Sequence, residues 1–167
     1  MPRLAIIPAR GGSKRIPGKN IKDFHGKPII AYSIETALKS GLFDEVMVST
    51  DDEKIKKISL EYGAKVPFMR SDNNSDDTAT TLQVIREVLE SYENEDRTFE
   101  EVCCIYPTAP LMKSSHLIAG LDLLENEIAS VFPVVPFSFP ILRSLKVDID
   151  NFVSMNWPEY SQTRSQD

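Results

Sequence analysis

The alternation of short apolar runs with amphipathic segments of helical period constrains the fold of this chain more than any other feature. Residues 4–8, 46–49 and 102–106 are short apolar runs, typical of strands that are buried on both faces of a sheet. Segments with an apolar stripe at helical spacing separate them. This order predicts a Rossmann-like, doubly wound α/β fold, in which a mainly parallel sheet carries helices on both faces. In such sheets, ligands bind beyond the carboxyl ends of the strands.

Local signals predict where the helices begin and end. Gly41 follows one apolar stripe and is expected to terminate that helix. Thr50 and Glu53 have the spacing of a capping box, which predicts that Thr50 caps the next helix. Ser114 or Ser115 is expected to cap the last helix.

The later part of the chain carries a weaker pattern. Residues 130–136 are expected to form a further strand, and residues 145–147 and 152–153 to form a hairpin. A chain of 167 residues with 41% hydrophobic composition is long enough for one core and short for two. We therefore expect residues 1–167 to form a single domain.

Charge and hydropathy exclude several classes of protein. The net charge of −6 argues against a nucleic-acid binder, because a phosphate backbone attracts positive surface. No apolar stretch approaches the roughly 20 residues that span a bilayer, so no membrane partner is expected. The amino end begins with a strand-like run rather than a signal peptide, which favours a cytoplasmic location. The adjacent Cys103 and Cys104 are expected to be buried, reduced thiols.

The loop of residues 9–20, directly after the first predicted strand, has the composition of an anion-binding site. Gly11 and Gly12 allow backbone N–H groups to approach an anion without obstruction by side chains. The cations of this loop are Arg10, Lys14, Arg15 and Lys19. Their charge suits a triphosphate, whereas the alternative is a surface turn with solvated charges. The glycine spacing matches neither the Walker loop nor the dinucleotide-binding fingerprint.

Four segments of the chain resemble one family of enzymes. Residues 7–20, 48–52, 106–111 and 163–167 read IPARGGSKRIPGKN, VSTDD, YPTAPL and TRSQD. They resemble the signatures of the cytidylyltransferases that activate acidic eight- and nine-carbon sugars, which include the CMP-sialic acid and CMP-pseudaminic acid synthetases. The resemblance spans essentially the whole chain, and residues 131–143 look more like the pseudaminate enzymes.

The resemblance implies a reaction and its residues. A sugar hydroxyl attacks the α-phosphorus of CTP, pyrophosphate leaves, and Mg²⁺ is the cofactor. Lys19 and Arg10 are implied as catalytic residues, and Arg143 and Arg164 as ligands of the sugar carboxylate. The implied nucleotide-binding residues are Ala9, Gly11, Gly12, Ser13, Asn20, Arg70, Thr78, Thr80, Tyr106 and Thr108. Among them, Asn20 and Arg70 match positions that read the edge of the cytosine.

Several of these residues also have a purely structural explanation. Asn20 would instead shape the loop, and Arg70 would be a solvated surface arginine. The threonines at 78–81 would cap the following helix, and the two sugar-site arginines would be ordinary surface charges. Asp51 and Asp52 suit Mg²⁺, but capping and the helix dipole alone explain their place at the start of a helix.

The resemblance also implies a longer protein. Relatives continue beyond the position of Asp167 with a metal-binding aspartate and a dimerisation arm, so we expect an incomplete carboxyl end and a homodimer at full length. We expect a CMP-sugar for cell-surface glycans, with pseudaminic acid as the favoured substrate. The alternatives are a CMP-N-acetylneuraminate or CMP-legionaminate synthetase, and a non-catalytic nucleotide-binding fragment.

Overall fold

The computed structural model describes residues 1–76, 78–124, 128–138 and 140–163. The chain divides into two compact units, Met1–Ala129 and Ser130–Asp167. Within the described residues, no helix is both long enough and apolar enough to cross a membrane.

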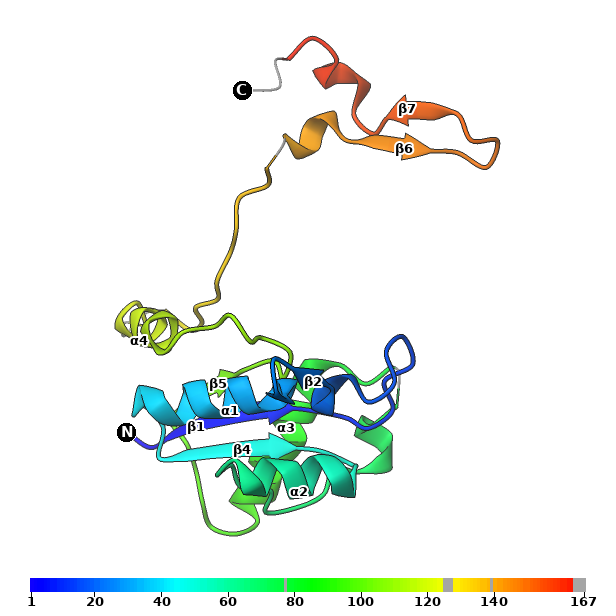
Figure 1. The fold of residues 1–167 in the computed structure, drawn as a ribbon. Helices are drawn as coiled ribbons and strands as arrows, with labels where there is room; N and C mark the ends of the chain where they lie inside the picture. Colours follow the sequence, from blue (N-terminus) through cyan, green and yellow to red (C-terminus); the bar gives the residue numbers. More distant parts are fainter. Residues whose placement is uncertain (77, 125–127, 139, 164–167) are drawn as a thin grey trace. The chain divides into compact units, whose positions relative to one another are not determined.

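A three-stranded parallel sheet forms the centre of the first unit (Figure 1). Its strands are β1 (Arg3–Pro8), β4 (Glu45–Ser49) and β5 (Glu101–Cys104), in the spatial order β4-β1-β5. Leu4 pairs with Glu45 on one side and with Val102 on the other, so β1 is the central strand. The predicted parallel sheet is confirmed.

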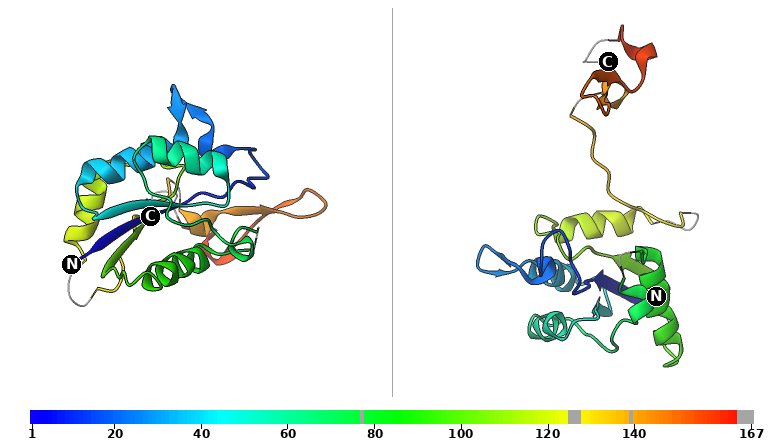
Figure 2. Two further views of the ribbon diagram at one scale, coloured as in Figure 1. Left: turned by 90° about the horizontal axis from the view of Figure 1, so that it is seen from below. Right: turned by 90° about the vertical axis from the view of Figure 1, so that its right-hand side faces the viewer.

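Helices cover both faces of this sheet, as the predicted fold class requires. The helices α1 (Ile29–Ser40), α2 (Glu53–Glu61) and α4 (Ser114–Asp122) contribute to one core cluster, and α3 (Thr81–Glu93) contributes to the other. The left view of Figure 2 shows α1 and α2 on one side of the sheet and α3, in green, on the other. Gly41 ends α1 with a φ of 66°, as predicted.

The sequence of β1 explains why the sheet is covered twice. Ala5 and Ile7 pack into the core beneath α1, whereas Leu4 and Ile6 pack on the opposite face. All four side chains are fully buried, and successive residues of a strand point to opposite faces. A continuous apolar run is therefore what a central strand between two helical layers needs.

Short elements connect the strands and helices of the first unit. The loop after β1 leads into a 3-10 turn, η1 (Lys19–Ile21), and a small hairpin, β2 (Asp23–Phe24) and β3 (Lys27–Pro28). A second 3-10 turn, η2 (Asp72–Asn74), precedes α3.

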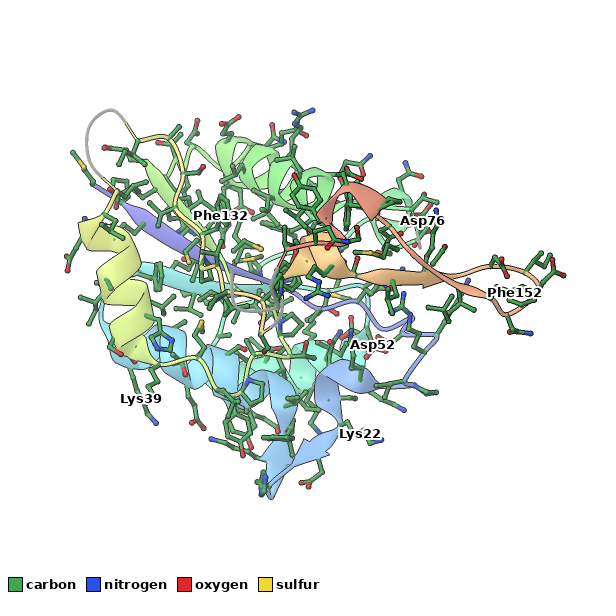
Figure 3. All side chains as sticks on the ribbon, turned by 90° about the horizontal axis from the view of Figure 1, so that it is seen from above. Lys22, Lys39, Asp52, Asp76, Phe132 and Phe152 are labelled. Atoms are coloured by element: carbon green, nitrogen blue, oxygen red, sulfur yellow. The ribbon has the colours of Figure 1, made fainter. Side chains whose placement is uncertain are left out.

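The predicted cap of α2 is wrong. Asp52 is the N-cap, and its Oδ1 accepts hydrogen bonds from Lys54 N at 2.8 Å and Ile55 N at 3.0 Å. Thr50 is completely buried, and its Oγ1 accepts from Asp52 N instead. The helix therefore begins two residues later than predicted, after Asp52 (labelled in Figure 3), because the Asp52 carboxylate accepts from the amides of the first turn.

The predicted cap of α4 is also wrong. The N-cap position is Lys113, and Ser114 is the first helical residue. The Ser114 hydroxyl donates to Thr36 O at 3.2 Å, so this side chain joins α4 to α1 rather than capping its own helix.

A cluster of polar side chains around the buried Glu45 ties the amino end of β4 to α3. The Glu45 side chain is 1% exposed, accepts from Tyr92 Oη, and forms ion pairs with Arg97 at 2.7 Å and Lys65 at 2.9 Å. Burial alone would raise the pKa of Glu45, but the hydrogen bonds from Arg97, Tyr92 and Lys65 hold it below its ordinary value.

The cysteines of β5 are free and partly buried. Burial raises the pKa of Cys103, and burial together with the neighbouring thiol raises the pKa of Cys104 to about 11. Both thiols are therefore neutral at physiological pH, whereas the thiolate is the reactive form of cysteine.

The second unit contains the predicted hairpin. Its strands β6 (Leu145–Val147) and β7 (Val153–Met155) pair antiparallel, and Asn151 in the turn has a φ of 66°. Two 3-10 turns flank the hairpin, η3 (Ile141–Arg143) and η4 (Pro158–Tyr160).

The strand expected at residues 130–136 is a wrong prediction. Within the described residues 128–138 no strand forms, and apolar side chains such as Val135 are exposed. Pro133 and Pro136 lack the N–H groups that a sheet ladder requires. The apolar composition alone was therefore a misleading signal.

Candidate active site

The residues predicted to bind a nucleotide gather where the strands of the parallel sheet end. Ala9 N donates to Ser49 O at 2.9 Å, which continues the pairing of β1 with β4 beyond Pro8. The loop of residues 9–20 then leaves the sheet beside the connection from β4 to α2. This is the edge at which open α/β sheets bind their ligands.

Three hydrogen bonds hold the loop in a closed shape. Gly11 N donates to Asp51 Oδ1 at 2.8 Å, and Ser13 N donates to Gly11 O at 2.9 Å. Asn20 Nδ2 donates to Arg10 O at 2.9 Å and joins the two ends of the loop. These bonds fix residues 9–13 and Asn20, whereas Lys14, Arg15 and Lys19 are exposed, so anion binding by this loop stays a prediction.

The two adjacent glycines have different surroundings. A Cβ atom on Gly11 would lie 2.7 Å from Asp52 Oδ2, so the loop rests directly on that carboxylate. A Cβ on Gly12 would meet no described atom within 4 Å. Packing on Asp52 therefore requires glycine at Gly11, whereas Gly12 leaves the backbone open to an approaching ligand.

The cations of the loop are presented in different ways. Arg10 donates to the carbonyl oxygen of Asp76, which ties the loop to the segment before α3. Lys19 is exposed and begins η1 directly after Gly18, whose φ of 62° favours glycine. The structure thus anchors the guanidinium of Arg10 and leaves Lys19 at the surface.

Asn20 is buried, with 4% of its surface exposed. Its Oδ1 atom is buried without a hydrogen-bond partner among the described residues. A buried acceptor without a partner costs about 1–3 kcal/mol, and a ligand that supplies a donor removes this cost. The Nδ2 end of the Asn20 amide therefore shapes the loop, whereas a contact of the Oδ1 end with a ligand stays a prediction.

Arg70 is also buried, with 8% of its surface exposed. Its Nε donates to Ser49 Oγ at 3.0 Å, and its Nη2 donates to Ser49 O. Burial lowers the pKa of Arg70, while the charges of Asp51 and Glu87 oppose this change. The alternative of a solvated surface arginine is wrong, because the side chain is fixed at the end of β4.

The two predicted threonines lie at the start of α3. Thr80 is its N-cap and forms a reciprocal capping box with Gln83, which confirms the capping alternative for this residue. Thr78 N donates to Asp76 Oδ1 at 2.8 Å, and the Thr78 hydroxyl contacts the same carboxylate. A ribose contact by either threonine stays a prediction.

Tyr106 and Thr108 follow β5 at the same edge of the sheet. Tyr106 O accepts from Ser33 Oγ at 2.9 Å, and its exposed ring carries a hydroxyl 3.3 Å from Thr81 Oγ1. Thr108 is half-buried. Tyr106 thus links the end of β5 to the first residue of α3.

The carboxylates at 51 and 52 do not make a metal site by themselves. Both Asp51 and Asp52 are engaged, one by the Gly11 amide and the other by the first turn of α2. In the described part of the chain, no group of three acidic, histidine or cysteine side chains is arranged to hold a metal ion. Capping therefore accounts for Asp52, and Mg²⁺ stays an expectation.

The two arginines predicted to hold the sugar belong to the second unit. Arg143 ends η3 and is partly buried. Arg164 lies outside the described residues. That Arg143 and Arg164 bind the sugar carboxylate therefore stays a prediction.

Several residues that organise this edge were missed in the sequence. Asp76 accepts from Thr78 N and Ala79 N, a local turn for which aspartate two residues before threonine is a usable signal. Ser49 anchors Arg70, and its signal is a polar residue that ends an apolar run. No sequence signal connects Asp51 with Gly11, because 40 residues separate them.

The fold and the loop define a nucleotide-binding α/β protein, and comparison with known proteins defines its class. The model of the cytidylyltransferase family matches residues 4–146. This chain belongs to the cytidylyltransferase family and is a nucleotidyltransferase. The resemblance found in its sequence motifs is confirmed.

Individual relatives agree with this assignment. The chain is 46% identical to a pseudaminic acid cytidylyltransferase of Campylobacter jejuni, over its whole length and 72% of that protein. It is 38% identical to a CMP-N,N'-diacetyllegionaminic acid synthase of Legionella pneumophila, over 81% of this chain and 58% of that protein. A solved CMP:2-keto-3-deoxy-manno-octonic acid synthetase complexed with CTP superposes with a TM-score of 0.65 at 26% identity. That similarity covers 77% of this chain and 49% of the synthetase.

Proposed function

We propose that this protein transfers CMP from CTP to an acidic nine-carbon sugar, with pseudaminic acid as the favoured acceptor, and releases pyrophosphate. The observation that carries this proposal is the 46% identity, over the whole chain, to a pseudaminic acid cytidylyltransferase. The folded, basic glycine loop at the carboxyl end of β1 supports it, because that loop suits a triphosphate.

The loop supplies the charge that phosphoryl transfer requires. Negative charge develops on the phosphoryl oxygens and on the leaving pyrophosphate as the sugar hydroxyl attacks the α-phosphorus. Arg10, Ser13 and Lys19 are proposed to contact the phosphates, with Lys19 stabilising the transition state. Lys19 is exposed at the mouth of the loop, where it can reach an incoming nucleotide.

Asn20 and Arg70 are proposed to recognise the cytosine. The buried Oδ1 of Asn20 needs a hydrogen-bond donor, and the exocyclic amino group of cytosine is one. Arg70 is fixed on Ser49, so its guanidinium has little freedom to adapt to another base. Rigid polar groups of this kind discriminate well, because a wrong base leaves them without partners.

Magnesium is the proposed cofactor, and it would neutralise charge on the phosphates. The described residues hold no complete metal site, so we assign no ligand among them. We further propose a cytoplasmic enzyme that dimerises at full length and serves cell-surface glycan synthesis.

Pyrophosphate release tests the proposed reaction. The protein is incubated with CTP, Mg²⁺ and, separately, pseudaminic, legionaminic and N-acetylneuraminic acids, with UTP in place of CTP as the control. We expect release with CTP that is fastest with pseudaminic acid. Faster release with legionaminic or N-acetylneuraminic acid would reassign the sugar. CTP binding without release in any mixture would favour a nucleotide-binding role without turnover.

A further inference from the structure

We propose, on the basis of the nucleotidyl transfer described above, that Asp51 is a positioning residue whose carboxylate holds the Gly11 amide and sets the path of the phosphate-binding loop. Asp51 follows β4 and Gly11 follows β1, so the contact spans the carboxyl ends of two adjacent parallel strands.

The hydrogen bond takes over where backbone pairing between these strands stops. Ala9 N to Ser49 O, at 2.9 Å, is the backbone bond that extends the pairing of β1 with β4. Two residues further along each chain segment, Gly11 N donates to Asp51 Oδ1 at 2.8 Å. A bond to an ionised acceptor is stronger than one between neutral groups, so this contact suits the task of fixing a loop.

Asp52 supports the same turn from beneath. Its Oδ2 would lie 2.7 Å from a Cβ on Gly11, so the glycine rests on this carboxylate. The other oxygen, Oδ1, accepts from Lys54 N and Ile55 N and is thereby fixed to α2. The two aspartates therefore have different roles. Asp51 accepts a hydrogen bond from the loop amide, and Asp52 packs against the backbone of the loop at Gly11.

Fixing Gly11 also fixes the groups on either side of it. The carbonyl of Arg10 accepts from Asn20 Nδ2 at 2.9 Å, so the position of the Gly11 amide determines where Asn20 is held. Burial lowers the pKa of Arg70, and the charge of Asp51 is the leading influence that opposes this change. Asp51 therefore contacts the loop directly, and its charge acts on the buried arginine that is also proposed to bind CTP.

Two substitutions separate the hydrogen bond from other roles of this side chain. Asp51→Ala removes the acceptor, whereas Asp51→Asn keeps an oxygen that can accept from Gly11 N. Glu53→Gln is the matched control, because Glu53 lies in the same segment and its side chain is 73% exposed. CTP binding is measured by calorimetry, together with kcat and KM, and hydrogen exchange is measured for the amides of residues 9–16.

We expect Asp51→Ala to bind CTP roughly 10- to 100-fold more weakly, the range for losing a hydrogen bond to a charged group. Its loop amides should exchange faster than those of the wild type. Asp51→Asn should recover part of the affinity and of the protection, because its neutral oxygen accepts a weaker hydrogen bond, and Glu53→Gln should match the wild type.

The outcomes distinguish this role from the proposed function itself. Wild-type protein that binds no CTP would overturn both. Wild-type protein that binds CTP, with Asp51→Ala binding it equally well, would overturn the positioning role alone. Equal weakening in Asp51→Ala and Asp51→Asn would show that charge matters and the Gly11 contact does not, which also overturns it.

Discussion

Gly11 turns over the carboxylate of Asp52 with no room for a side chain, while its neighbour Gly12 faces open space. We expect Gly11→Ala to lower the free energy of unfolding by about 1–3 kcal/mol, because the loop or Asp52 must shift. Gly12→Ala should change it by less than about 0.5 kcal/mol. Urea unfolding of both variants measures the difference. Equal stability of the two variants would contradict the tight packing at Gly11.

Lys19 carries its charge on an exposed side chain of the loop, so removing this side chain should not disturb the packing of the fold. We expect Lys19→Ala to reduce kcat roughly 100-fold or more, the usual loss when a group that stabilises a developing anion is removed. Pyrophosphate release with CTP and pseudaminic acid measures this loss.

The matched control for Lys19 is Lys57→Ala, which removes another exposed lysine, in α2. This variant should keep full turnover, and both variants should melt like the wild type. Near-normal turnover of Lys19→Ala would refute its catalytic role.

At the scale of elements, β4 is fixed at both of its ends. Its carboxyl end holds Arg70 through Ser49, and its amino end holds Tyr92, Arg97 and Lys65 through Glu45. The guanidinium of Arg97 also lies 4.9 Å from the centre of the Tyr92 ring. β4, which leads into Asp51 and Asp52, is thus also fixed at its amino end by the cluster around Glu45.

Removing the Glu45 charge should weaken this cluster in a pH-dependent way. We expect Glu45→Gln to lower the free energy of unfolding at pH 7 by about 2 kcal/mol, because three donors lose an ionised acceptor. The pKa of Glu45 in the folded protein lies below its ordinary value of 4.5. Its contribution is therefore complete above that pH and is lost as pH falls through the lower, folded value.

Urea unfolding at a series of pH values between neutrality and acid measures this effect. The difference between wild type and Glu45→Gln should be largest at pH 7 and should shrink in acid. Glu61→Gln, which alters an exposed carboxylate at the end of α2, is the control and should follow the wild type. A difference that does not depend on pH would contradict the role of the ionised Glu45.

At the scale of the whole molecule, the chain consists of two units, and the second begins with exposed apolar side chains. Phe132 and Phe137 are 73% and 74% exposed, and the described residues around them form neither helix nor strand. We expect chymotrypsin to cut first at these two residues, because proteases prefer exposed, unpaired backbone. Mass spectrometry of a limited digest identifies the cuts.

The amino-terminal fragment left by this cut should unfold at the same temperature as the first unit does in the intact protein. Its parallel sheet and its helices all lie before residue 130. Replacing both phenylalanines by serine should slow the first cleavage without changing that midpoint. First cuts within β1 or α1 would contradict this division of the chain.

Local pattern was sufficient for the three strands of the parallel sheet and for the helices that cover it. The uninterrupted apolar run of β1 can be stable only between two helical layers, and adjacent glycines with clustered cations predict an anion-binding loop. The hairpin β6–β7 was predictable for the same reason, because its turn residues specify a reversal locally.

Only the tertiary structure decided which side chains meet at the site. Asp51 reaches Gly11 and Arg70 reaches Ser49 because parallel strands bring distant segments to one edge of the sheet. The choice of Asp52 rather than Thr50 as the cap also depended on tertiary structure, because Thr50 is completely buried after β4. Residues 130–136 are different, because Pro133 and Pro136 were already a local signal against a strand. Periodicity specifies which elements form, whereas strand register specifies which residues face one another.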